Sequence, residues 1–71
     1  MLLTGTIVSV SRENNIAMAK VNANGVIIRV ALALLPDAEV GAQVLVEGGV
    51  AISIITQEQV KEKQHVPRNS G

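Results

Sequence analysis

The sequence predicts an all-β domain, and three observations support this prediction. Hydrophobic residues make up 48% of the 71 residues although Phe, Tyr and Trp are absent. The core must therefore consist of aliphatic side chains, which pack well on a pleated sheet. Apolar and polar residues alternate over several short runs, as in half-buried strands. Asn24-Gly25 separates two of these runs and favours the positive φ angles of a tight hairpin turn.

The first two strands follow from alternation. Over residues 6–11 we expect Val8 and Val10 to face the core, and the polar residues 12–15 to end the strand. A second strand is predicted over residues 16–22. Its inward side chains are expected to be Ala17, Ala19 and Val21.

The middle of the chain begins with the return strand of the Asn24-Gly25 hairpin, predicted over residues 26–30. Residues 31–35 fit either a helical turn or a continuation of that strand. Pro36 disfavours helix at the residue before it, and residues 36–39 are typical of a turn.

The last third of the chain contains two more predicted strands and a helix. Residues 43–47 form the fourth strand, and Gly48-Gly49 makes a sharp bend. Residues 50–55 form a fifth strand that is apolar enough to be buried on both faces. A capping box at residues 56–59 predicts a short helix over residues 57–65.

These elements together predict a small five-stranded OB-like β-barrel with a short C-terminal helix. The barrel would span residues 1–56, the helix residues 57–65 and a flexible tail residues 66–71. Because the chain is short, it is expected to be a single domain with a thin margin of stability.

Composition excludes several function classes. Six basic and six acidic residues give a net charge of zero, and neither a basic face nor aromatic stacking residues favour nucleic acid. There is no Cys, and a single His, His65, cannot form a metal site alone. No grouping of Ser, His and acid would activate a nucleophile. We therefore expect a binding protein that is not an enzyme and has no cofactor.

The N-terminal residues suggest neither a signal peptide nor a membrane span, so a cytoplasmic location without membrane contact is expected. His65 fits an exposed position near a helix end. Glu47 fits either an exposed carboxylate at a strand end, the commoner case, or a partner contact beside the Gly48-Gly49 bend.

One long stretch carries a family resemblance. Residues 40–53, VGAQVLVEGGVAIS, follow residues 31–36, ALALLP. In this order they resemble the HypC/HupF family of hydrogenase maturation chaperones. Residues 5–10 and 19–22 fit as well, so the resemblance covers about residues 5 to 60.

The resemblance implies an OB-like barrel with a C-terminal helix. It also implies protein partners: the precursor of the nickel–iron hydrogenase large subunit, or a HypD-like maturation protein. The family begins Met-Cys-Leu-Gly and usually has His before the glycine bend, whereas this chain has Leu2 and Glu47 there. Since neither Leu nor a lone carboxylate replaces a thiolate ligand, the iron-carrying role is not expected to carry over. We expect the partner contact at Met1, Leu2, Leu3, Thr4, Glu47, Gly48 and Gly49.

Two other functions fit parts of the sequence. Residues 4–10 and the small size also resemble molybdate-binding Mop-like domains, whose oxyanion sites use backbone N–H groups and hydroxyls. The high apolar fraction also allows a self-assembling structural subunit, a homo-oligomer that buries barrel surface.

Overall fold

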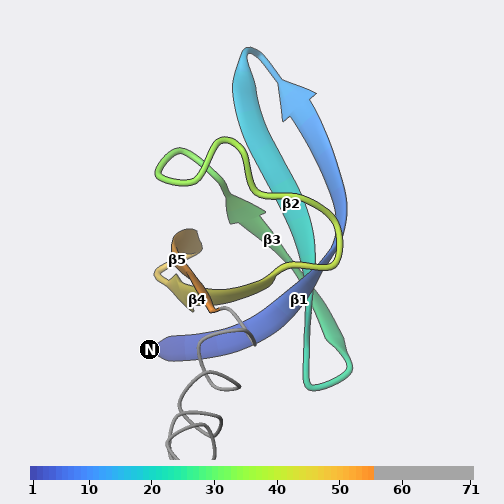
Figure 1. The fold of residues 1–71 in the computed structure, drawn as a ribbon, viewed down its shortest axis with the longest axis vertical. Coiled ribbons are helices and arrows are strands. Elements are labelled where there is room, and N and C mark those ends of the chain that lie inside the picture. The colour runs from blue at the N-terminus through green and yellow to red at the C-terminus, as the bar shows by residue number, and fades with distance from the viewer. Residues whose placement is uncertain (56–71) are drawn as a thin grey trace, which may run out of the picture.

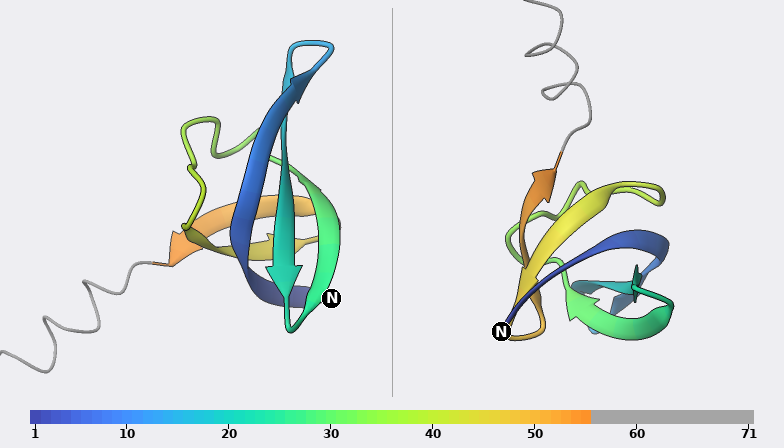
Figure 2. Two further views of the ribbon diagram at one scale, coloured as in Figure 1. Left: turned by 90° about the vertical axis from the view of Figure 1, so that its right-hand side faces the viewer. Right: turned by 90° about the horizontal axis from the view of Figure 1, so that it is seen from below.

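The structure, a computed structural model, describes residues 1–55 as a closed barrel of five strands. The strands are β1 (Leu2–Glu13), β2 (Ile16–Ala23), β3 (Val26–Ala31), β4 (Gln43–Glu47) and β5 (Val50–Ile55). They close in the order β1-β2-β3-β5-β4, as Figures 1 and 2 show. The predicted OB-like barrel is confirmed. The predicted helix over residues 57–65 and the tail over residues 66–71 lie outside the described residues.

The long strand β1 connects the two halves of the barrel. Its first part, from Leu2 to Thr6, pairs antiparallel with β4, and its remainder, from Thr6 to Glu13, pairs antiparallel with β2. The far end of the β1–β2 hairpin rises above the rest of the barrel (Figure 1). β1 is therefore the strand that places the beginning of the chain next to β4.

The Asn24-Gly25 hairpin forms as predicted. The φ angles are 55° at Asn24 and 87° at Gly25, and the flanking residues Ala23 and Val26 pair across the turn. Asn and Gly adopt positive φ at low cost, which explains why they occupy this turn. The side-chain oxygen of Asn22 accepts a hydrogen bond of 2.7 Å from the backbone N–H of Gly25.

The barrel interior is aliphatic throughout the described residues, where no polar or charged side chain is buried. Ala19 and Val21 are buried as predicted, and Ala17 packs against the core. The buried hydrophobic residues are Ile7, Ala19, Val21, Val30, Leu32, Ala38, Val44, Val46 and Ala51.

The prediction that Val8 faces the core was wrong, and Val10 is not buried. Ile7 is the buried residue of β1, with 1% of its surface exposed, whereas Val8 is 43% exposed and Val10 41%. A β-bulge between Ile7 and Ser9 inserts Val8 as an extra residue, which shifts the alternation by one position. Past the bulge, Val10 pairs with the buried Ala19 and so lies on the inner face of the sheet, but it remains exposed.

The connection from β3 to β4 contains three turns, and the last is closed by a 3.0 Å backbone hydrogen bond from Ala42 N–H to the Glu39 carbonyl. Backbone hydrogen bonds from Leu35 N–H to the Leu32 carbonyl, and from Ala38 N–H to the Leu35 carbonyl, close the first two turns in succession. Residues 31–35 do not continue the strand, because β3 ends at Ala31, and residues 32–35 form a single hydrogen-bonded turn. Residues 36–39 form the predicted turn region, and Ala38 is buried beneath it.

β5 forms over the predicted residues but is not buried on both faces. Only Ala51 is buried, and residues 52–55 are exposed. In the described part of the chain the barrel is a single curved sheet, and no second layer covers its outer surface. A strand of such a barrel can bury only the side chains that point inward.

Candidate protein-binding site

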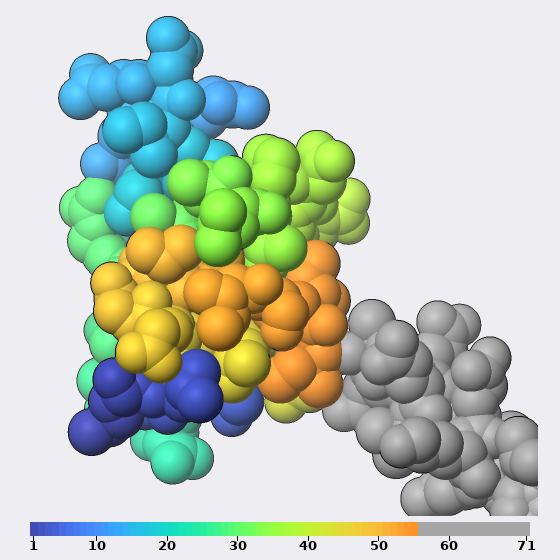
Figure 3. All heavy atoms as spheres, turned by 90° about the vertical axis from the view of Figure 1, so that its left-hand side faces the viewer, coloured from blue at the N-terminus to red at the C-terminus, as the bar shows by residue number. Residues whose placement is uncertain are grey.

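The beginning of β1 and the bend between β4 and β5 lie side by side. Leu2 pairs with Glu47, Leu3 with Val46 and Thr4 with Leu45. Gly48 and Gly49 follow directly as the β4–β5 turn. Figure 3 shows the first residues, in blue, against the gold and orange surface of this turn and β5. The structure thus brings all the predicted contact residues to one end of the barrel: Met1, Leu2, Leu3, Thr4, Glu47, Gly48 and Gly49. We call this set the end site.

Strand alternation decides which of these side chains are presented outward. Val44 and Val46 of β4 are buried, so their cross-strand partners Gly5 and Leu3 lie on the inner face. Leu2 and Thr4 occupy the alternate, outward positions and are exposed, and Leu3 is also 37% exposed although it lies on the inner face. The turn closes because Gly48 and Gly49 adopt φ angles of 59° and 80°, which side chains disfavour. The end site is therefore a surface site whose backbone is anchored by the core beneath it.

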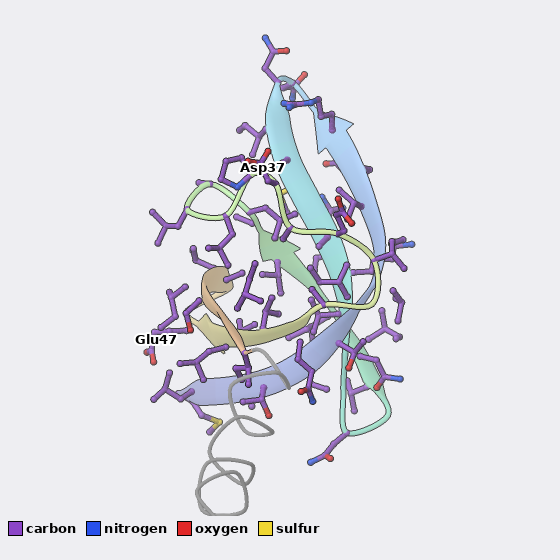
Figure 4. The ribbon with its side chains drawn as sticks, in the orientation of Figure 1. Asp37 and Glu47 are labelled. Carbon is purple, nitrogen blue, oxygen red and sulfur yellow. The ribbon has the colours of Figure 1, made fainter. Side chains whose placement is uncertain are left out.

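The electrostatics of the end site depend on one ion pair. The ammonium group of Met1 lies 3.3 Å from Oε2 of Glu47, and the two side chains are 85% and 50% exposed. Exposed pairs of this kind contribute about 0–1 kcal/mol to stability. In Figure 4 Glu47 points away from the barrel at the end of β4, far from Asp37 on the connection. The carboxylate of Glu47 is thus open to a partner at little cost to the fold.

Leu2 and Glu47 occupy the two positions at which the resemblance places the family Cys and His. They are direct cross-strand partners, and such residues have Cβ atoms about 4.5–5.5 Å apart. A thiolate and an imidazole at these positions would lie together, whereas here an aliphatic side chain faces a carboxylate. In residues 1–55 no group of three or more His, Cys, Asp or Glu is placed to hold a metal ion. The arrangement can contact another protein but offers no thiolate to a soft metal.

Two neighbours of the end site were not predicted. Leu45 lies opposite Thr4, and Val50 lies opposite Glu47, both half-buried on the outer face. Their alternation with the buried Val44, Val46 and Ala51 is the sequence signal that marks them as outward residues. Their apolar surface extends the end site across β4 toward β5.

Among the described residues, no helix is long and apolar enough to cross a membrane. His65 lies outside the described residues, and Asp37 is exposed in its turn and not part of the end site.

The described residues form a small OB-like β-barrel whose end site is exposed. The family model of the HupF/HypC family matches residues 3–66. The chain therefore belongs to the HupF/HypC family, as its resemblance predicted. Members of this family are accessory chaperones of hydrogenase maturation. No curated protein matches the chain.

Proposed function

We propose that this chain binds a protein partner in nickel–iron hydrogenase maturation through its end site, without carrying the iron fragment itself. The partner is the precursor of the hydrogenase large subunit or a HypD-like maturation protein. The single observation that carries the proposal is the pairing of Leu2 with Glu47, which joins the two segments of the end site. Family membership supplies the class of partner.

The end site has the character of a protein contact. Met1, Leu2 and Leu3 are exposed large apolar residues, and Leu45 and Val50 add half-buried apolar surface beside them. Burying apolar surface is the main favourable term in protein association, and Glu47 can orient the partner through a basic side chain. Contact through this end needs no rearrangement of the core.

The chemistry of the same two positions argues against a carrier role. A soft, strong ligand such as a thiolate is suited to an iron–cyanide–carbonyl fragment. Leu2 offers no donor atom, and Glu47 is a lone hard carboxylate that already faces the Met1 ammonium. We propose that the chain keeps the chaperone's contact with its protein partner and leaves the iron fragment to another protein.

Affinity purification from cells that express a nickel–iron hydrogenase operon tests the contact. We expect the tagged chain to recover the large-subunit precursor or a HypD-like protein. Replacement of Leu2 by Ser should weaken that capture at least fivefold, since truncation of a residue that contributes to an interface costs more than about 1 kcal/mol.

The matched control is Ile16→Ser. Ile16 is an exposed aliphatic strand residue like Leu2, with exposed fractions of 51% and 58%, but it lies at the far end of the β1–β2 hairpin. Ile16→Ser should therefore leave capture unchanged. Equal losses in the two variants, or no maturation protein captured by the native chain, would contradict the proposal.

Metal content tests the second part of the proposal. The native chain, purified without oxygen from the same cells, should contain no iron and show no infrared bands of bound carbon monoxide or cyanide. The double variant Leu2→Cys, Glu47→His restores a thiolate and an imidazole at paired positions and should gain iron relative to the native chain. Stoichiometric iron in the native chain would refute the claim that it does not carry the fragment.

A further inference from the structure

The tip of the β2–β3 hairpin combines an exposed Asn with a following Gly. Asn24 and Gly25 are both exposed, and nothing lies within 4 Å of the position that a Gly25 side chain would occupy. An Asn side-chain amide can be attacked by the backbone nitrogen of the next residue. Glycine offers the least steric hindrance to this attack because it lacks a side chain. The hairpin tip is therefore chemically vulnerable.

The reaction needs only water. The backbone nitrogen of Gly25 loses its proton to solvent and attacks Cγ of Asn24. A new C–N bond forms, the bond from Cγ to Nδ2 breaks, and ammonia leaves with the proton. Water then opens the cyclic imide at Cγ to give aspartate, or at the backbone carbonyl to give isoaspartate. No oxidant or reductant takes part.

The structure places a restraint on the attacking atom. The Gly25 N–H donates a 2.7 Å hydrogen bond to Oδ1 of Asn22. The strand ladder ends at the pair formed by Ala23 and Val26, so the Gly25 N–H has no place in that ladder. The bond to Asn22 both engages the proton that must leave and holds the nitrogen toward Asn22.

The other Asn residues of the barrel provide a comparison. Asn14 and Asn15 also adopt positive φ, 53° and 68°, in the β1–β2 turn. Neither is followed by glycine, and the β-branched Ile16 after Asn15 crowds the attacking nitrogen. Asn22 in β2 is followed by Ala23, whose side chain also hinders the attack. The vulnerable pair is therefore Asn24-Gly25 among the described residues.

We propose that Asn24 is a site of spontaneous conversion to aspartate and isoaspartate, and that the Asn22 side chain restrains this conversion. Either product raises the number of acidic side chains from six to seven and lowers the net charge by one. Isoaspartate also adds one methylene to the backbone of a two-residue turn, which disturbs the pairing of Ala23 with Val26. Asn22 thus protects both the charge and the register of the hairpin.

The test is prolonged incubation of the full chain at mildly alkaline pH. Peptide mass mapping and enzymatic isoaspartate detection follow the conversion at position 24, and Asn69 is measured separately. Asn22→Ala removes the acceptor, and we expect conversion about fivefold faster than in the native chain, the factor that corresponds to one net hydrogen bond. Asn22→Asp keeps an acceptor oxygen and should convert no faster than the native chain.

Two further measurements separate loss of the hydrogen bond from loss of the hairpin. Amide exchange at Val26 should show the hairpin still closed in Asn22→Ala. The chain unfolded in urea sets the unrestrained rate, which should be the fastest. Equal rates at position 24 in Asn22→Ala and the native chain would overturn the proposed role of Asn22. The chain unfolded in urea sets the time in which position 24 converts. If neither the native chain nor Asn22→Ala converted at position 24 within that time, Asn24 would not be a conversion site in the folded protein.

Discussion

Gly5 shows how a single residue can determine the geometry of the barrel. It is buried in β1, and its requirement is space rather than a positive φ angle. A Cβ atom built there would lie 2.5 Å from Cγ1 of Val21 and 2.7 Å from the backbone oxygen of Asn22. Only glycine lets β1 approach β2 this closely at the point where β1 passes from its β4 pairing to its β2 pairing.

Gly5→Ala should destabilise the barrel through this clash. Because one of the close atoms belongs to the backbone, the strands must separate, and we expect a loss of about 1–3 kcal/mol in the free energy of unfolding. Urea denaturation followed by circular dichroism measures it. In Gly48→Ala the new side chain meets open space and costs only the strain of a positive φ, about 1 kcal/mol. If Gly5→Ala lowered the free energy of unfolding no more than Gly48→Ala does, the close approach of β1 to β2 would not be the reason for glycine at position 5.

At the scale of strands, the bulge in β1 separates two aliphatic neighbours into different environments. Ile7 lies in the core, and its backbone N–H and carbonyl bond to Ala42 and Gly41 of the incoming connection, at 2.9 and 2.8 Å. Val8 is the extra residue of the bulge and faces solvent. One inserted residue thus decides which aliphatic side chain supports the core.

The two residues should respond very differently to truncation. We expect Ile7→Ala to lower the free energy of unfolding by about 2–5 kcal/mol, as buried aliphatic truncations do. Val8→Ala should change it by less than about 0.5 kcal/mol, because surface substitutions have small effects. Equilibrium denaturation of both variants measures the two free energies of unfolding. A larger loss at Val8 than at Ile7 would mean that the bulge is misplaced.

Local chemistry explains which strands could be predicted from the sequence. The Asn24-Gly25 turn and the β4 bounds were predicted correctly, because turn residues and short alternating runs carry their own signal. Val8 was predicted in place of Ile7 as the inward residue of β1, since a bulge has no signature in alternation alone. The burial of β5 was overestimated because its composition does not reveal that no second layer covers it.

The role of the end-site residues in partner contact stays a prediction, and their geometry could not be predicted from the sequence. Its residues came from the family resemblance and the glycine bend, which are both visible along the chain. The pairing of Leu2 with Glu47 joins positions 45 residues apart, and such a register depends on the closed barrel. Leu45 and Val50 were missed because their place beside the site appears only once β4 lies between β1 and β5.

At the scale of the whole molecule, the extent of strand pairing differs around the barrel. β3 and β5 meet in parallel at a single register pair, Ala31 with Val50, supported by a 2.9 Å bond from Ala31 N–H to the Gly49 carbonyl. By contrast, the pairing of β1 with β2 continues from Thr6 to Glu13. The contact between β3 and β5 is therefore the weakest part of the described barrel.

Native-state hydrogen exchange should reveal this difference. The amides of Ala31 and Ile7 both donate backbone bonds of 2.9 Å, so bond length alone would protect them equally. We expect Ala31 to exchange faster, because local opening of the β3–β5 contact disrupts less buried apolar surface than opening around Ile7. Equal protection of the two amides would indicate that the barrel opens only as a whole.

The aliphatic interior has a practical consequence for studying complexes. Every side chain buried in the described barrel ends in methyl groups, so methyl resonances can report on the entire core and on the end site above it. The chain also lacks tryptophan and tyrosine, and so it contributes no intrinsic fluorescence of its own. Any such emission from a complex therefore comes from the partner, and a shift on mixing reports the partner's side of the contact alone.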